Sequence, residues 1–404
     1  MTDTNTATYN PFEPGFAEDP YPQYEALRDG DPVHHSPFGI WGLFQYDDVL
    51  RFLRDSELSV EDRNANPSPM TDIAQQVLGE EAERGSYAML NRDPPDHTRL
   101  RRLVSKAFTP RMIEALKPRI QQLVDESLDS MAARGGGEVV ADLAFPLPFQ
   151  VITELLGMPD TDTEQLREWS GLLVRTLEPV FDPEVLRAIG VAGRQMAALV
   201  TKAIDDKREH LGEDLLSGLI AAEENGDVLS QDELVDQVML LYIAGHETTV
   251  NLIGNGTLAV VRNPDQLARL SAAPDLVAGG VEELLRYDSP VQMSRRITRR
   301  DVEIGGKTIE AGAFVILVLA SANRDPRHFG DSASRLDLSR SDAKTHLSFG
   351  GGHHLCLGAA LARLEAQIAI GSLVQRFPNL SLAGEPRWNG LLNLRGLSEL
   401  AIAL

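Results

Sequence analysis

The chain contains one cysteine, Cys356, in a segment rich in glycine and histidine. The segment reads Phe349-Gly350-Gly351-Gly352-His353-His354-Leu355-Cys356-Leu357-Gly358. An amphipathic stretch from Ala359 to Phe377 follows it and predicts a helix. The thiol is therefore expected at a helix N-terminus, where the helix dipole and free N–H groups stabilise a thiolate. Because thiolates act as nucleophiles or metal ligands, the segment predicts one of these two roles.

The cysteine segment alone leaves the choice between these roles open. Its glycines allow the backbone to pass close to a flat or bulky group, and Phe349 is placed to cover one side of the sulfur. His353, His354 and Cys356 also suggest zinc, but a structural zinc site needs four ligands and there is no second cysteine. A cysteine hydrolase would need a partner histidine and an orienting group, which the sequence does not exclude.

A second candidate motif lies in the middle of a long helix predicted from Ser230 to Arg262. Its centre reads Ala244-Gly245-His246-Glu247-Thr248-Thr249. The small residues let another group approach the helix backbone, and the Thr248 hydroxyl can reach the Ala244 carbonyl and open the helix locally. A carboxyl beside such a threonine is poorly explained by packing. The motif indicates proton delivery to a bound ligand, with a buried polar patch at a helix kink as the alternative.

Glu283 and Arg286 place an acid and a base three residues apart on one face of a predicted helix. Such pairs are usually solvated on the surface. Here the neighbours Val281, Leu284 and Leu285 are apolar, so we interpret the pair as partly buried and structural rather than catalytic.

Cationic side chains form a further group. His97 and Arg101 lie four residues apart on a predicted helix, so both can donate to one anion. Arg295 and Arg296 are neighbours on a predicted strand and point to opposite faces, so only one of them can face an internal anion. Together with His354, these residues indicate donors around an anionic, flat, metal-containing body.

The elements that must position these motifs are mostly helical, and we predict a mainly α protein with a minor β portion. Residues 60–92 contain Pro67, Pro69 and Gly85 and are interpreted as a long irregular loop. Further helices are predicted near 21–28, 47–54, 95–107, 110–133, 148–157, 162–178, 183–209, 213–223 and 277–287. Strands are predicted around 32–44, at 297–304 and 313–319, and near Leu380 and Leu400.

Composition limits the classes of function. The chain has 404 residues, 43% of them hydrophobic, and we expect one domain over 1–404 with a short flexible N-terminus of about nine residues. The 38 Lys and Arg against 60 Asp and Glu give a net charge of −22, which argues against nucleic acid and anionic membrane surfaces as partners. No signal peptide is recognisable, and the apolar runs are shorter than the roughly 20 residues of a membrane span. We expect a cytoplasmic protein.

Taken together, the motifs resemble those of a cytochrome P450 of the soluble bacterial, actinobacterial type. The resemblance covers about Asn10 to Leu404, and its motifs occur in the family's order. They are Phe349…Cys356-Leu357-Gly358, Ala244-Gly245-x-Glu247-Thr248-Thr249, Glu283-x-x-Arg286, His97-x-x-x-Arg101 and Ala322-Asn323-Arg324-Asp325. One departure is Leu336, which stands where the family often has Phe.

The resemblance implies the triangular-prism fold, with the long helix crossing over haem b, which is iron protoporphyrin IX. Cys356 would be the axial ligand of the iron, next to Phe349, Gly358 and Ala244. The haem propionates would be held by His97, Arg101, Arg296 and His354. Glu247 and Thr248 would relay protons, and Glu283 with Arg286 would form the structural pair.

The resemblance also implies a monooxygenase that inserts one atom of O2 into a C–H bond of an apolar molecule, such as a terpenoid, steroid, polyketide or fatty acyl compound. The alternative on the same fold is a peroxide-driven or C–C coupling haem oxidase, and the intact acid–threonine pair argues against the peroxide type. Electrons would come from a ferredoxin and its reductase, and we expect a monomer. The docking patch would include Arg101, Arg102, Lys106, Arg111, Arg340 and Lys344. Pocket walls are expected at Met89, Leu90, Leu241, Ala244, Gly245, Val291, Met293 and the 391–393 turn with Leu392.

Overall fold

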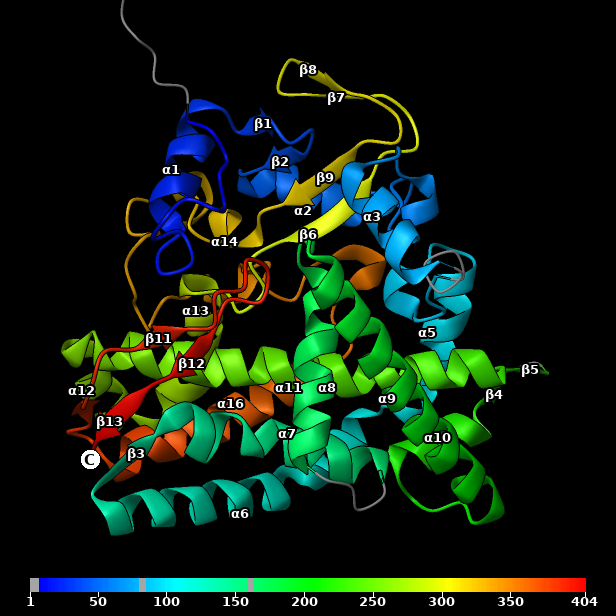
Figure 1. The fold of residues 1–404 in the computed structure, drawn as a ribbon. Coiled ribbons are helices and arrows are strands. Elements are labelled where there is room, and N and C mark those ends of the chain that lie inside the picture. The colour runs from blue at the N-terminus through cyan, green and yellow to red at the C-terminus, as the bar shows by residue number, and fades with distance from the viewer. Residues whose placement is uncertain (1–6, 80–84, 159–162, 225) are drawn as a thin grey trace, which may run out of the picture.

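The computed structural model describes residues 7–79, 85–158, 163–224 and 226–404, and helices dominate this part of the chain (Figure 1). In chain order the first helices are α1 (Tyr21–Gly30), α2 (Tyr46–Arg54), α3 (Pro69–Leu78), α5 (Asp96–Ala107), α6 (Pro110–Arg134), α7 (Pro146–Leu156), α8 (Thr163–Val174) and α9 (Pro183–Glu209). They are followed by α10 (Leu215–Ala221), α11 (Gln231–Val261), α12 (Pro264–Ala272), α13 (Val277–Tyr287), α14 (Leu319–Ala322), α15 (Pro326–Phe329) and α16 (Ala359–Arg376).

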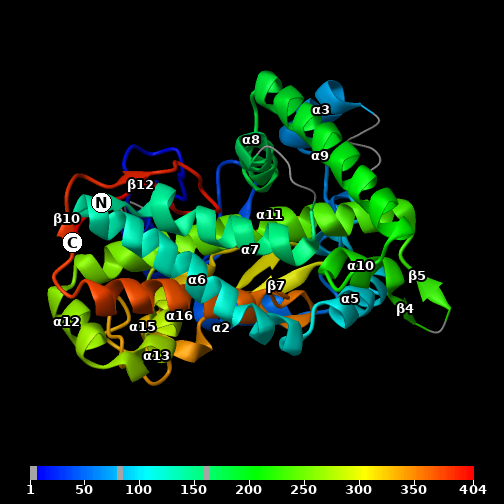
Figure 2. The same ribbon diagram turned by 90° about the horizontal axis from the view of Figure 1, so that it is seen from below.

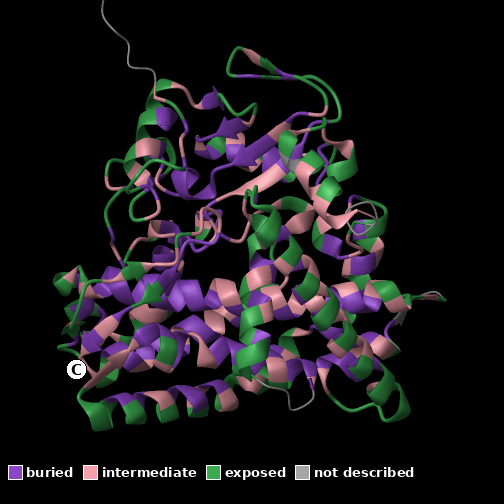
Figure 3. Cartoon of the chain, in the orientation of Figure 1, coloured by how far each residue is buried: buried purple, intermediate pink, exposed green. Residues whose placement is uncertain are grey.

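The helix α11 is the axis of the molecule. It has 31 residues, so it is about 47 Å long. It begins at a capping box in which Ser230 and Glu233 satisfy each other's backbone N–H groups. It packs against α7, α16 and α9, and Figure 2 shows α6, α7, α11 and α16 side by side. Its C-terminal half is buried on all sides, as the purple ribbon in Figure 3 shows, so it belongs to the main apolar core.

Most of the strands lie at the top of Figure 1, away from the layer formed by α6, α7, α11 and α16. Four strands pair in the order β1 (Val33–His35), β2 (Trp41–Leu43), β9 (Phe314–Leu317) and β6 (Ser294–Ile297), and only the β2–β9 pair is parallel. A second sheet pairs β10 (Ser381–Leu382), β13 (Ala401–Ala403) and β3 (Gly136–Glu138). Two-stranded pairs are formed by β4 (Glu223–Glu224) with β5 (Asp227–Val228), β7 (Val302–Ile304) with β8 (Lys307–Ile309), and β11 (Arg387–Trp388) with β12 (Leu397–Glu399).

The predicted fold class, mainly α with a minor β portion, is confirmed, but two local predictions are wrong. The expected irregular loop 60–92 contains α3 and the short 3-10 turns Asp62–Asn64 and Met89–Asn91; its residues 80–84 lie outside the described part. The helix α3 forms because Ser68 and Thr71 make a capping box and Pro69 occupies the first turn, where its missing N–H costs nothing.

The second error concerns the strand expected over 297–304. The strand β6 ends at Ile297, and β7 begins at Val302 and pairs with β8 instead. The alternation is in fact interrupted there, because residues 298–301 are all polar, and the apolar positions Val302 and Ile304 are out of step with Ile297. The short helix α12 was also missed, because Asn263-Pro264 ends α11 and Pro264 immediately starts the next helix.

Within the described residues, no helix combines the length and the apolar character needed to cross a membrane.

Candidate active site

The cysteine loop is held by its backbone against the end of α2. The Cys356 N–H donates to the Phe349 carbonyl at 2.9 Å, which closes the loop. Gly350 and Gly352 have φ values of 71° and 66°, in the left-handed region that favours glycine. A side chain at Gly352 would also collide with the carbonyl of Leu53, whereas one at Gly358 would meet no atom within 4 Å. The loop therefore has a fixed shape and an open side next to the cysteine.

The Cys356 sulfur lies at the start of α16, as predicted, and accepts hydrogen bonds from the N–H groups of Gly358 and Ala359. The predicted net stabilisation of the thiolate is not found, because burial raises the pKa of the thiol more than these donors lower it. Cys356 is nevertheless accessible to solvent. In the described part of the chain no histidine forms a hydrogen bond with this sulfur, so the pairing that a thiol hydrolase requires is missing there.

The centre of α11 presents small and polar groups. The Thr248 hydroxyl donates to the Ala244 carbonyl at 3.0 Å, the hydrogen bond expected from the sequence, while α11 continues as one helix through this point. Ala244 is exposed although it lies mid-helix, and a Cβ at Gly245 would come within 3.1 Å of Ile152. Burial raises the pKa of Glu247, and the nearby Arg167 opposes that rise.

His246, which the sequence motif left without a role, links α11 to α8. Its Nδ1 lies 2.8 Å from the Tyr242 carbonyl, and a carbonyl only accepts, so Nδ1 carries the proton. Burial lowers the pKa of His246 to about 4, so the ring is neutral at pH 7. Its Nε2 is therefore an acceptor, and the Ser170 hydroxyl donates to it at 3.0 Å.

Three histidines gather beside the cysteine loop. The ring of His97 lies 4.2 Å from that of His354 and 5.3 Å from that of His353. Both ring nitrogens of His97 and Nε2 of His354 are buried without a hydrogen-bond partner. Burial and the neighbouring positive groups lower the pKa of His97 to about 4 and that of His354 to about 2. A neutral ring carries one N–H, so His97 has a buried donor without a partner whichever nitrogen is protonated, and a bound anion would accept from it.

The two neighbouring arginines on β6 diverge as predicted. Arg296 is buried and donates to the Leu53 carbonyl, and burial lowers its pKa to about 10. Arg295 points the other way and forms an ion pair with Asp62. Arg101 donates to the Leu355 carbonyl at 2.6 Å, so it supports the cysteine loop directly.

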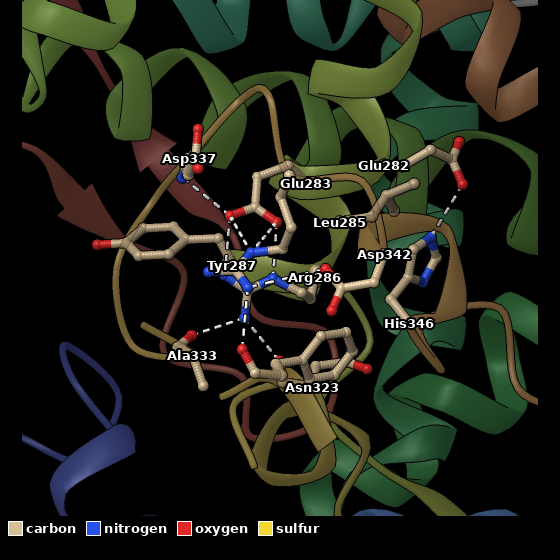
Figure 4. A network of polar contacts seen from close by, with 12 residues as sticks. Glu282, Glu283, Leu285, Arg286, Tyr287, Asn323, Ala333, Asp337, Asp342 and His346 are labelled. Carbon is tan, nitrogen blue, oxygen red and sulfur yellow. Dashed lines mark hydrogen bonds and ion pairs between the residues drawn. The ribbon is translucent and has the colours of Figure 1, made fainter. Parts of the chain in front are cut away.

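Glu283 and Arg286 form a fully buried ion pair on α13 (Figure 4). Arg286 Nε lies 2.6 Å from Glu283 Oε2, and Nη2 lies 2.8 Å from Oε1. The guanidinium also donates to the carbonyls of Asn323, Ala333 and Arg335. The pair therefore holds two distant segments of chain against α13.

The predicted pocket residues separate into two groups. Met89 is buried, and its N–H donates to Gln237 on α11, one helical turn before Leu241, whereas Leu90 is exposed. On the other side Val291 forms a bridge with Leu394, and the Met293 N–H donates to the Asn393 side chain. Met293 and Leu392 pack against the same apolar cluster. The structure therefore joins the 291–293 segment and the late turn.

The predicted basic patch needs one correction. Arg340 is not available for docking, because its side chain is 7% exposed and lies against Glu283 and Asp342. Arg340 turns toward the buried Glu283 carboxylate and pairs with it, a contact that the sequence spacing did not reveal. Arg102, Lys106, Arg111 and Lys344 are exposed, as the patch requires.

Sequence reasoning missed Glu365, a buried carboxyl on α16. Burial raises its pKa to about 8, partly offset by a hydrogen bond from Thr249 on α11. Its Oε2 has no hydrogen-bond partner among the described residues. The available signal was the place of Glu365 on an apolar helix face, since Leu361 lies four residues before it and Ile368 three residues after it.

Comparison with known families and proteins decides what this arrangement belongs to. The family model described as cytochrome P450 matches residues 177–389. The chain belongs to the cytochrome P450 family. The resemblance drawn from the sequence motifs is thereby confirmed, and the protein is a monooxygenase whose chemistry uses thiolate-ligated haem iron and O2.

Relatives of this cytochrome P450 are similar over nearly their whole length. Cytochrome P450 107B1 of Saccharopolyspora erythraea is 41% identical, and the match covers 97% of this chain and 96% of that protein. The vitamin D(3) 25-hydroxylase of Pseudonocardia autotrophica is also 41% identical, with 100% and 98% covered. The crystal structure of P450BioI in complex with hexadec-9Z-enoic acid ligated acyl carrier protein has a TM-score of 0.88, 38% identity, and 96% and 98% covered.

Proposed function

We propose that this cytochrome P450 hydroxylates an apolar organic molecule on haem b held by Cys356. When bound, the haem activates O2 so that one oxygen atom enters a C–H bond and the other leaves as water, with two electrons and two protons consumed. The observation that carries the proposal is the position of the only thiol at the open side of a rigid loop, beside buried histidine donors without partners.

The residues present fit the cofactor. Cys356 would ligate the iron, and a metal cation would offset the burial that raises the pKa of the free thiol. The accessible faces of Gly358 and Ala244, with Phe349, would contact the macrocycle. His97, His354 and Arg296 supply buried donors for the two carboxylates of protoporphyrin, with Arg101 beside the loop.

Glu247 and Thr248 would deliver the protons. The raised pKa of Glu247 lets its carboxyl hold a proton nearer to neutral pH than an exposed glutamate does. Thr248 keeps its hydroxyl in place through the Ala244 carbonyl and can accept further hydrogen bonds with its lone pairs. The intact pair favours O2-driven oxygenation over the alternative peroxide-driven or C–C coupling reaction.

The substrate class follows from the predicted pocket walls. Met89, Leu241, Val291, Met293 and Leu392 are apolar, and they suit a terpenoid, steroid, polyketide or fatty acyl molecule. Two relatives support such substrates, since one is named for vitamin D(3) and another was solved with a fatty acyl carrier protein.

Bacterial cytochromes P450 draw electrons from redox partners, and we propose a ferredoxin with its reductase for this one. The exposed side chains of Arg102, Lys106, Arg111 and Lys344 would attract the acidic surface of a ferredoxin despite the net charge of −22.

The test is optical and catalytic. The haem-loaded protein, reduced under CO, should show the strongly red-shifted Soret band of thiolate ligation, and Cys356→Ala should lose it. Product should then form with O2, reduced ferredoxin and an apolar substrate. A colourless protein after haem supplementation would refute the proposal, and turnover with peroxide but not with reduced ferredoxin would establish the alternative.

A further inference from the structure

The carboxylate of Glu178, in the connection between α8 and α9, forms hydrogen bonds with the distant turn 392–394. Glu178 directly follows the 3-10 turn Arg175–Leu177, just before α9. Its two carboxylate oxygens accept the backbone N–H groups of Leu392 at 2.8 Å, Asn393 at 2.9 Å and Leu394 at 3.3 Å. In Figure 1 this end of α8 lies beside the red turn that precedes β12. Three N–H donors on one carboxylate make a charge-assisted contact.

The turn that Glu178 grips is itself joined to the other predicted pocket segment. The Asn393 carbonyl accepts the N–H of Gln292 at 2.8 Å, and its side-chain oxygen accepts the N–H of Met293 at 3.2 Å. Leu392 and Met293 pack on one apolar cluster. Glu178 is therefore connected through Asn393 to Met293, a side chain expected to contact the substrate.

Two apolar side chains close to Glu178 in the chain are exposed. Leu177 is 43% exposed and Phe181 is 51% exposed. Both side chains therefore present apolar surface beside the carboxylate that holds the turn. Glu178 is half-buried and lies in the chain between these two exposed apolar side chains.

We propose that Glu178 is a latch that positions the pocket turn and controls how fast an apolar substrate enters and leaves between the α8–α9 connection and residues 392–394. This inference rests on the proposed function, because it assumes that the turn lines the substrate pocket. While the three N–H groups are bound, the connection closes over the turn. When they are released, Leu177 and Phe181 move away with the connection and the passage opens. Glu178 touches no reacting atom and acts only through the turn.

Glu178→Gln is the most direct variant, because it keeps the shape of the side chain. It replaces one acceptor oxygen by an NH2 donor that faces backbone N–H groups, so part of the contact is lost together with its charge. Glu178→Ala removes the contact entirely. Glu178→Asp keeps the charge but is shorter by one CH2 and should fall between wild type and Gln.

The experiment uses the haem-loaded protein and two haem-binding probes, clotrimazole as a bulky apolar azole and imidazole as a small one. Stopped-flow absorbance at the Soret band gives association and dissociation rates. We expect both rates for clotrimazole to rise roughly tenfold in Glu178→Gln and further in Glu178→Ala. Imidazole rates should stay unchanged, because a small probe does not need the wide passage.

Glu184→Gln is the matched control, since this glutamate lies on α9, is largely exposed and pairs with Arg187 at the surface. It should behave as wild type. Wild-type clotrimazole rates in both Glu178→Gln and Glu178→Ala would overturn the latch, and so would an equal change for both probes. A wild-type protein that binds neither probe would instead refute the proposed function.

Discussion

The hydroxyl of Ser170 on α8 donates to Nε2 of His246 on α11 at 3.0 Å, one residue before Glu247. Both partners are buried. This hydrogen bond ties the helix that precedes the α8–α9 connection to the helix that carries the acid–threonine pair. The position of α8 and the position of Glu247 are therefore coupled through a single neutral ring.

Removing the donor should weaken this coupling. Ser170→Ala leaves the His246 acceptor buried and unpaired, so we expect a loss of about 1–2 kcal/mol in the free energy of unfolding. Denaturant unfolding of the haem-loaded protein measures it. In a His246→Leu background the same serine change should cost nearly nothing, and an additive double mutant would show that the two side chains do not interact.

Thr248→Ala should still bind haem but should consume electrons without forming the corresponding product. Without the hydroxyl, protons reach the haem site less selectively, and the ratio of product formed to electrons consumed should fall roughly tenfold. Thr248→Ser keeps the hydroxyl and should stay close to wild type. Full coupling in Thr248→Ala would contradict the relay role of this residue.

Glu365 predicts a pH-dependent stability. Its pKa is raised from 4.5 to about 8, so in this range the folded protein holds a proton that the unfolded chain has released. The free energy of unfolding should therefore decline as pH rises from about 4.5 to about 8 and level off above that. Glu365→Gln stays neutral at all these pH values. Its free energy of unfolding should therefore exceed that of wild type by a margin that grows over this pH range to about 5 kcal/mol. Unfolding curves at several pH values that remain parallel would contradict this assignment.

The buried ion pair on α13 predicts a large loss of stability. Glu283→Gln leaves the Arg286 charge buried without its counter-charge, and we expect a loss of about 3–5 kcal/mol in the free energy of unfolding. Glu184→Gln, which breaks a surface pair, should cost less than about 1 kcal/mol. If the two variants unfolded alike, Glu283 would not have the structural role proposed for it.

Much of the fold could be predicted because strong local signals coincide. The helix α11 has a serine cap, an acidic first turn and a proline stop, and it was predicted to within a residue at each end. The helix α3 was not predicted, because its capping box has Thr71 where the usual pattern has Glu or Gln. The polar residues and prolines around it are also typical of a loop. The prediction of one strand over 297–304 was wrong because it ran across the four polar residues 298–301, which separate β6 from β7.

The sequence by itself determined the chemical inventory and its order along the chain: the lone thiol before a helix, the acid–threonine pair within a long helix, and the i, i+3 pair of α13. These depend on residue type and short spacing, which local geometry fixes. Only the tertiary structure decided that Arg340 turns inward, that His246 joins α8, that Glu365 is buried, and that Glu178 grips a turn more than 200 residues later. The physical reason is that burial and long-range hydrogen bonds depend on which elements pack together, and no short sequence pattern encodes that.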